Sequence, residues 1–119
     1  MIAYHSCGNC CDALDELADI GLDVINPIQP LAMDPLMVKK RFGKRLTLFG
    51  AIDVQHLMPF GTKEEIVGKV REYKKYLGAE GGYILSPAHH IQSDTSLENI
   101  MAFYEAAKEP TDYDRTYCG

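Results

Sequence analysis

A histidine and a cysteine stand two residues apart in the stretch His5-Ser6-Cys7-Gly8, directly after an apolar run. Successive side chains of an extended segment point to opposite faces, so residues 5 and 7 share one side. Imidazole nitrogen and thiolate sulfur are both ligands of zinc, which binds its ligands tetrahedrally. We therefore expect His5 and Cys7 to hold one zinc ion, with a third protein ligand supplied by another strand.

His89 is the best candidate for that third ligand, and the adjacent His90 is its competitor. His89 follows Ser86-Pro87-Ala88 at the end of an apolar run, where strand-helix proteins place reactive side chains. The alternative interpretation is that these histidines are exposed or hydrogen-bonded loop residues, because an isolated His-x-Cys pair is a motif of low specificity.

The segment Cys7-Gly8-Asn9-Cys10 also has the spacing of a thiol redox motif, in which a helix N-terminus lowers the pKa of the first thiol. This alternative requires a hairpin after the central helix, and the sequence continues instead with three further strand-helix repeats. Cys10 and Cys11 are expected at the start of a helix, and Cys118 in a tail. Clustered cysteines of this kind indicate thiol or metal chemistry rather than a disulfide framework.

Three further polar residues follow apolar runs. Asp53 comes after Phe49-Gly50-Ala51-Ile52, where a carboxylate either acts in catalysis, together with His89, or caps the loop. Asn26 and Gln29 flank Pro27 and Ile28 at the equivalent position of an earlier run. Their amides, with His90, are candidates for binding a small-molecule substrate, and the alternative is that they satisfy loop backbone.

Positioning these residues requires four strands, and four apolar or β-branched runs predict them. The run from Leu46 to Ile52 is nearly continuous in apolarity, which is typical of a buried parallel strand. We expect all four strands to be buried. The runs are Ile2 to Tyr4, Val24 to Ile28, Leu46 to Ile52 and Tyr83 to Leu85.

Helix signals lie between the runs. Asp34-Pro35 predicts a helix start, and Thr62 to Glu65 and Thr95 to Glu98 each fit a capping box. Glycines that follow the helical segments predict left-handed C-caps at Gly21, Gly43 and Gly78. Apolar faces at helical spacing are Leu14, Leu17 and Ala18; Ile66, Val70, Tyr73 and Leu77; and Ile100, Phe103, Tyr104 and Ala107.

The repeated order of strand and helix predicts an α/β fold with four β/α units. We expect one domain over residues 1–109 and a polar C-terminal tail over residues 110–119. The formal net charge of −5 and the short basic runs make nucleic acid an unlikely partner. The sequence has no long apolar stretch and no signal peptide at its start, so we expect no membrane association and a cytoplasmic location.

Together these motifs resemble the uroporphyrinogen decarboxylase and corrinoid methyltransferase superfamily. The resemblance runs from about residue 2 to residue 108. It is carried by Tyr4-His5-Ser6-Cys7-Gly8, Asp23-Val24-Ile25-Asn26-Pro27-Ile28-Gln29-Pro30, Phe49-Gly50-Ala51-Ile52-Asp53 and Gly81-Gly82-Tyr83-Ile84-Leu85-Ser86-Pro87-Ala88-His89-His90-Ile91.

The resemblance implies the C-terminal half of a (β/α)8 TIM barrel. It also implies that an N-terminal half, which in the decarboxylases engages the tetrapyrrole, has no counterpart in this sequence. We expect such a half-barrel to form a homodimer or to pair with the missing half, because its sheet edges and inner face are otherwise exposed.

Two chemistries are known in this superfamily. In the methyltransferases, which carry methyl groups between corrinoid proteins and thiols, a His-x-Cys pair and a later cysteine hold zinc. His5 and Cys7 match the pair, whereas His89 stands where the later cysteine is expected. In the decarboxylases a histidine of the last strand's loop binds substrate carboxylates, and His89 matches that position. A zinc-dependent methyltransferase, a tetrapyrrole decarboxylase and a catalytically inert fragment all stay open.

Overall fold

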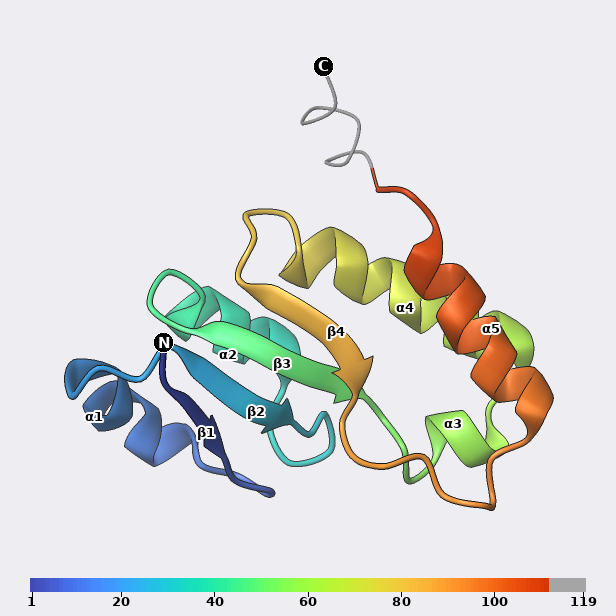
Figure 1. Cartoon of the computed structure of the whole chain (residues 1–119), viewed down its shortest axis with the longest axis horizontal. Coiled ribbons are helices and arrows are strands. Elements are labelled where there is room, and N and C mark those ends of the chain that lie inside the picture. The colour runs from blue at the N-terminus through green and yellow to red at the C-terminus, as the bar shows by residue number, and fades with distance from the viewer. Residues whose placement is uncertain (112–119) are drawn as a thin grey trace.

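Four strands form one parallel sheet in the computed structural model, which describes residues 1–111. The strands are β1 (Ala3–His5), β2 (Val24–Ile28), β3 (Thr47–Ile52) and β4 (Tyr83–Pro87). They lie in the order β1-β2-β3-β4, and each neighbouring pair is parallel (Figure 1). Most of the predicted polar tail, including Cys118, lies outside the described residues.

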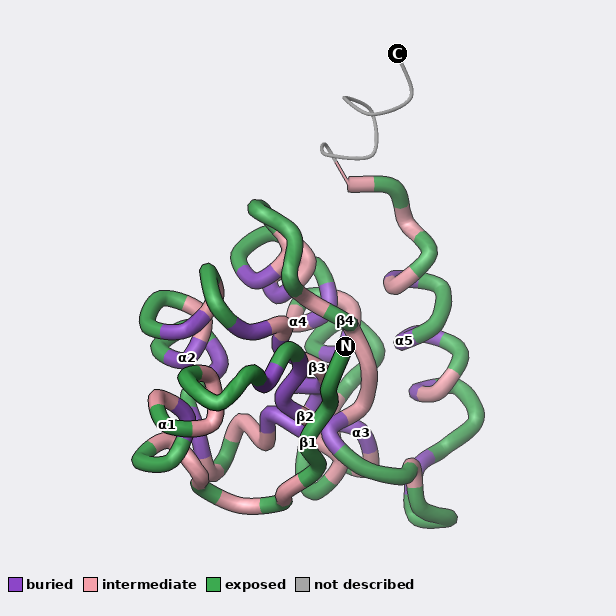
Figure 2. Tube along the Cα trace, turned by 60° about the vertical axis from the view of Figure 1, so that its left-hand side comes forward, coloured by how far each residue is buried: buried purple, intermediate pink, exposed green. Residues whose placement is uncertain are grey.

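A helical segment follows each strand, which confirms the α/β fold with four β/α units. These segments are η1 (Cys11–Ala13) with α1 (Leu14–Asp19), α2 (Pro35–Phe42), α3 (Leu57–Phe60) with α4 (Lys63–Leu77), and α5 (Leu97–Lys108). Figure 2 shows α1, α2 and α4 gathered on one side of the sheet, and α5 packs against α4 near the β4 edge. The described helices include none long and apolar enough to cross a membrane.

Local capping explains where the longer helices begin. Asp34 accepts a hydrogen bond from Leu36 N at 2.9 Å at the start of α2, and Thr62 and Glu65 form the predicted capping box of α4. The capping box predicted at Thr95 is wrong. The hydroxyl of Ser96 caps α5 instead, because Asn99 rather than Glu98 is then the third helical residue.

Of the three predicted left-handed glycine C-caps, only the one at Gly21 is confirmed. Gly21 has φ +105° after α1, in the left-handed region that favours glycine. Gly43 and Gly78 end α2 and α4 with right-handed φ values of −62° and −88°. A Cβ at Gly43 would stand 2.4 Å from the carbonyl oxygen of Lys39, so close approach of the preceding turn, not a left-handed backbone, explains this glycine.

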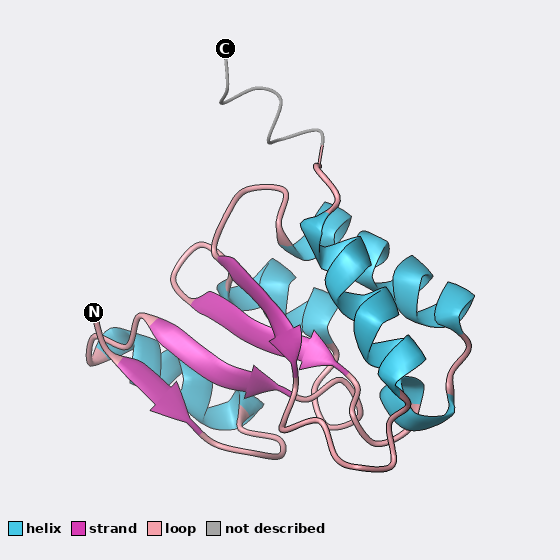
Figure 3. Ribbon diagram, turned by 45° about the vertical axis from the view of Figure 1, so that its right-hand side comes forward, coloured by secondary structure: helices cyan, strands magenta, loops and turns pink. Residues whose placement is uncertain are grey.

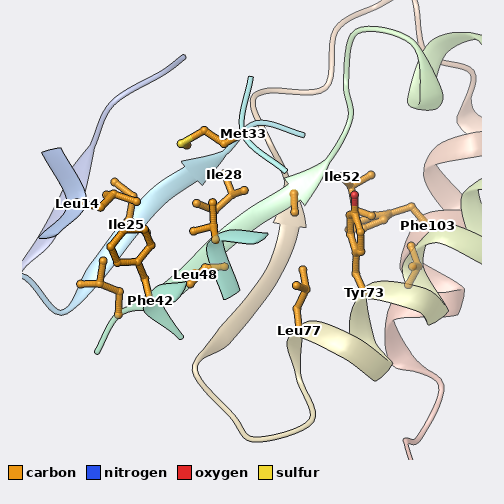
Figure 4. Packing of buried hydrophobic residues seen from close by; sticks show 14 of the residues in the cluster. Leu14, Ile25, Ile28, Met33, Phe42, Leu48, Ile52, Tyr73, Leu77 and Phe103 are labelled. Carbon is orange, nitrogen blue, oxygen red and sulfur yellow. The ribbon is translucent and has the colours of Figure 1, made fainter. Parts of the chain in front are cut away.

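The core lies between the sheet and the helices of its covered face. Leu48 and Ile25 pair in register and are both fully buried, with Phe42 of α2 beside them (Figure 4). The predicted face of α4 is buried as expected, and Figure 4 shows Tyr73 and Leu77 turned toward the sheet. Burying a side chain of this size stabilises the fold by about 1.5–3 kcal/mol.

The other face of the sheet is less covered, and β1 and β4 are its two edges. β1 is exposed along its length, so the prediction that all four strands are buried is wrong there, because β1 pairs only with β2 and forms an edge (Figure 3). Ile84 of β4 is 42% exposed, although its neighbours are half-buried. The predicted buried face of α5 is wrong for Tyr104, which is exposed, whereas Phe103 and Ala106 are buried.

Candidate functional site

His5 ends β1 and stands beside Asn26 of β2, because the parallel register pairs these two residues. The Nδ1 atom of His5 lies 2.7 Å from Oδ1 of Asn26. The backbone continues the pairing one residue further, since Ser6 N donates to Asn26 O at 2.9 Å. The imidazole is therefore held at the carboxyl edge of the sheet by a neighbouring strand.

Cys7 lies on the same side of the chain as His5. Its sulfur is 3.7 Å from Nε2 of His5, the ring nitrogen that Asn26 leaves free. Two ligands of one tetrahedral zinc are about 3.6 Å apart when the bonds are about 2.3 Å to sulfur and about 2.0–2.1 Å to nitrogen. The spacing of this pair therefore fits one zinc ion without rearrangement, and both side chains are exposed.

Gln29, just beyond β2, holds the turn that carries Cys7. Its Oε1 accepts a hydrogen bond from Gly8 N at 2.5 Å. Gly8 has φ +85°, a conformation that a side chain would strain. The glycine after Cys7 is thus explained by the turn, and the amide of Gln29 contacts backbone.

His89 and His90 follow β4 at the same edge of the sheet. Their rings meet edge to face with centroids 5.0 Å apart, and both are exposed. A shallow cleft of about 280 Å³ brings together residues of all four strands and of the loop after β4. It is lined by His5, Asn26, Phe49, Ser86, Pro87, Ala88, His89 and His90.

The cleft brings together His5 and His89, two of the predicted ligands, without assembling a closed metal site. Among the described residues, no three His, Cys, Asp or Glu side chains converge closely enough to hold a metal ion. His5 and Cys7 fit as two ligands, and His89 faces the same cleft as His5. Phe49 and Ser86 were not anticipated. They line the cleft because β3 and β4 pair in register with Phe49 opposite Ile84 and Ala51 opposite Ser86.

Asp53 lies past the end of β3, and its carboxylate is engaged by the loop that it begins. It accepts hydrogen bonds from the backbone N–H groups of Gln55, His56 and Leu57 at 2.9–3.1 Å. His56, in the same loop, has Nδ1 3.7 Å from the same carboxylate. Ala51, two residues earlier, has φ +86°, a strained value for alanine.

The second thiol of the Cys-x-x-Cys segment has a different environment. Cys10 is half-buried, and its Sγ lies 3.9 Å from Sδ of Met33. Burial, reinforced by the neighbouring Cys11 thiol, raises the pKa of Cys10. A nucleophilic thiolate needs a lowered pKa, so this environment favours an unreactive thiol.

The fold and the cleft define an α/β protein of the (β/α)8-barrel type, of which this chain forms four units with donor groups at the carboxyl ends of its strands. The chain belongs to the uroporphyrinogen decarboxylase family, whose model matches residues 1–110. This finding confirms the family inferred from the motifs.

Individual relatives include both kinds of enzyme in the superfamily. A methylated-thiol–coenzyme M methyltransferase of Methanosarcina mazei is 29% identical over 108 residues, which cover 88% of this chain and 27% of the relative. A uroporphyrinogen decarboxylase of Danio rerio is 32% identical over 93 residues, covering 78% and 24%. The chain thus spans about a quarter of the length of these curated relatives.

A solved structure shows the same fold. A methyltransferase from Methanosarcina mazei superimposes with a TM-score of 0.69 and 24% identity, over 97% of this chain and 31% of that one. The four β/α units therefore correspond to part of a larger enzyme's fold.

Proposed function

We propose that this chain carries the zinc-binding rim of a methyltransferase that moves a methyl group between a corrinoid and a small thiol. The observation that supports this most directly is the His5 Nε2 to Cys7 Sγ separation of 3.7 Å, with the other ring nitrogen held by Asn26. The methyltransferase relative acts, by its name, on a methylated thiol and coenzyme M. A metal that binds thiolates is suited to a small thiol as the acceptor of the methyl group.

Each residue has a defined part in this proposal. When bound, zinc would hold the acceptor thiol and lower its pKa, so that a thiolate forms near neutral pH. His5 and Cys7 bind the metal, and His89, from across the cleft, is the third ligand, with His90 as its substitute. Asp53 orders the loop after β3, and its catalytic role stays a prediction, because three backbone N–H groups already engage its carboxylate.

Metal analysis of protein purified without chelators tests the proposal. We expect about one zinc per chain in the wild type and little in Cys7→Ser. Cys11→Ser is the matched control, because it makes the same change four residues away on a partly buried thiol, whereas it is the Cys7 sulfur that lies 3.7 Å from Nε2 of His5. Equal zinc content in all three proteins, or none in the wild type, would refute the metal site.

A second candidate function is binding of a tetrapyrrole by the same cleft, as in the decarboxylases. It is favoured by His89 and His90, two exposed imidazoles in the cleft that could pair with substrate carboxylates. Titration with a porphyrinogen, followed by fluorescence of the oxidised product, tests it. Saturable binding weakened by His89→Ala and unaffected by Cys7→Ser would favour this function over methyl transfer.

The inert-fragment interpretation predicts that the chain binds no porphyrinogen and transfers no methyl group, whether or not it binds zinc. A thiol redox function is less favoured than either, because the described strands are all parallel, with no hairpin among them. A thiol-disulfide exchange assay with a small disulfide would detect it directly.

We also propose that the open sheet is covered by another polypeptide, a second copy of this chain or a separate N-terminal half, and that a corrinoid protein is the methyl donor. The free edges belong to β1 and β4. A two-fold axis along the strands would place β4 of one copy beside β1 of the other in parallel. Light scattering at several concentrations tests the dimer, and a mass of 13.3 kDa throughout would refute it.

A further inference from the structure

Two amide side chains of one short segment contact the His5–Gly8 stretch, 21 residues earlier in each case. Asn26 Oδ1 lies 2.7 Å from His5 Nδ1, and Gln29 Oε1 lies 2.5 Å from Gly8 N. We propose that Asn26 is a positioning residue, which fixes His5 in the tautomer whose Nε2 carries no proton and faces Cys7. Gln29 fixes the turn that presents Cys7. The inference deepens the proposed function and depends on it only for the identity of the bound metal.

The tautomer follows from the chemistry of the contact. A neutral imidazole carries a proton on one ring nitrogen and a lone pair on the other. The Asn26 carbonyl oxygen can only accept, so the nitrogen facing it, Nδ1, carries the proton. Nε2 then carries the lone pair, and it is Nε2 that faces the Cys7 sulfur at 3.7 Å.

The backbone makes this arrangement rigid. Ser6 N donates to Asn26 O at 2.9 Å, between the two amide contacts, so three hydrogen bonds tie residues 5–8 to residues 26–29. Both amides are partly buried, and Asn26 also lines the cleft. These contacts give Asn26 and Gln29 a part in supporting the zinc ligands, and the substrate binding expected from the sequence stays a prediction.

Loss of a hydrogen-bond partner to a metal-bound histidine typically lowers metal affinity by about 10- to 100-fold. Asn26→Leu removes the acceptor at nearly constant size and should produce a loss in this range. Asn26→Asp keeps an acceptor oxygen and should restore affinity to the wild-type level or above. Gln29→Leu should weaken binding less, because Gln29 acts on the backbone beside Cys7 and not on a ligand.

The first experiment needs no metal. Nitrogen-15 NMR of the imidazoles at about pH 8, where free imidazole is mostly neutral, reports the tautomer of each histidine, and His5→Gln identifies the His5 signals. We expect the Nδ1–H form of His5 in the wild type and in Asn26→Asp, and a mixture of both tautomers in Asn26→Leu.

The second experiment is a zinc competition titration of the same variants. Gln55→Leu is the control, because Gln55 is an exposed amide at the same end of the sheet whose backbone N–H binds Asp53. Circular dichroism establishes that each variant is folded, and Gln29→Leu provides a second test if Asn26→Leu does not fold. The control should bind zinc as tightly as the wild type.

The outcomes separate the two proposals. The Nδ1–H tautomer in a protein that binds no zinc would support the positioning role and refute the zinc site. Two results would overturn the positioning role and leave the zinc site intact. One is zinc binding by a protein whose His5 is in the Nε2–H form before metal is added. The other is equal zinc affinity in wild type, Asn26→Leu and Gln29→Leu.

Discussion

The buried amide of Asn99 joins two elements that are far apart in the sequence, and its removal should destabilise the protein. Asn99 lies in the first turn of α5 and is 8% exposed. Its Nδ2 donates to the carbonyl oxygens of Met58 at 2.9 Å and Gly61 at 3.0 Å. These carbonyls belong to the last turn of α3 and the residue after it, so Asn99 caps a helix that cannot satisfy them itself.

The expected loss follows from those two bonds. A net contribution of about 1 kcal/mol for each gives about 2 kcal/mol, and leaving the buried carbonyl oxygen of Met58 without a partner adds about 1–2 kcal/mol more. We expect Asn99→Ala to lower the free energy of unfolding by about 2–4 kcal/mol, a large share of the typical 5–15 kcal/mol. Asn99→Asp should cost at least as much, because a carboxylate of the same size cannot donate to either carbonyl.

Urea unfolding followed by circular dichroism measures the effect, at one fixed protein concentration because association would shift the midpoint. The midpoint should fall by about 1–2 M at an unchanged slope of about 2 kcal/mol per M. Gln92→Ala, at an exposed amide in the preceding loop, is the control. A change within about 0.5 kcal/mol for Asn99→Asp would show that packing rather than hydrogen bonding places α3.

Three further substitutions and one titration test the fold. Tyr83→Phe removes the hydrogen bond from the phenol to Gly50 O at 2.9 Å and should cost about 1 kcal/mol in urea unfolding. Gly50→Ala should cost more than about 1 kcal/mol, because Gly50 has φ +123° and a Cβ would stand 3.2 Å from Ile28 N. Gly68→Ala, with no atom within 4 Å of the added Cβ, should raise the melting temperature by stabilising α4 by about 0.5–1 kcal/mol. Burial raises the pKa of Tyr73 to about 12. The unfolded chain therefore ionises this phenol first, so its share of the stability is complete below about pH 10 and falls by about 1.4 kcal/mol per pH unit from there to about pH 12. Urea midpoints over this range should fall more steeply in the wild type than in Tyr73→Phe.

The strands were predictable because their residues carry the signal themselves. Val24 to Ile28 is observed with the predicted bounds, and the strand predicted from Leu46 begins one residue later. The exposure of β1 was not predictable from its composition, because burial of a strand depends on which strands lie beside it. The same limit explains Tyr104, whose spacing fits a helical face that α4 and the sheet do not reach.

The sequence predicted on which side of the chain the site residues lie, but not which groups they contact. Period-two geometry places His5 and Cys7 on one side, and the parallel register places Asn26 beside His5. Neither rule states what an amide binds, because its oxygen accepts equally well from a ligand, a ring or a backbone N–H. That ambiguity is why the sequence alone could not give the contacts that Asn26 and Gln29 make with His5 and Gly8, and their substrate binding stays a prediction.

The contacts that arrange the zinc pair all lie within residues 5–29, on β1, β2 and the turns that follow them. An arrangement made by two adjacent strands does not need the rest of a barrel, so even a chain without catalytic activity should bind the metal. Zinc content therefore tests the metal pair of His5 and Cys7. Methyl transfer needs its own measurement. Transfer from methylcobalamin to a small thiol, followed by the cobalamin spectrum, should be faster with wild type than with Cys7→Ser. Zinc binding without that difference would mean that this chain keeps the metal pair of its family and lacks the means to use it.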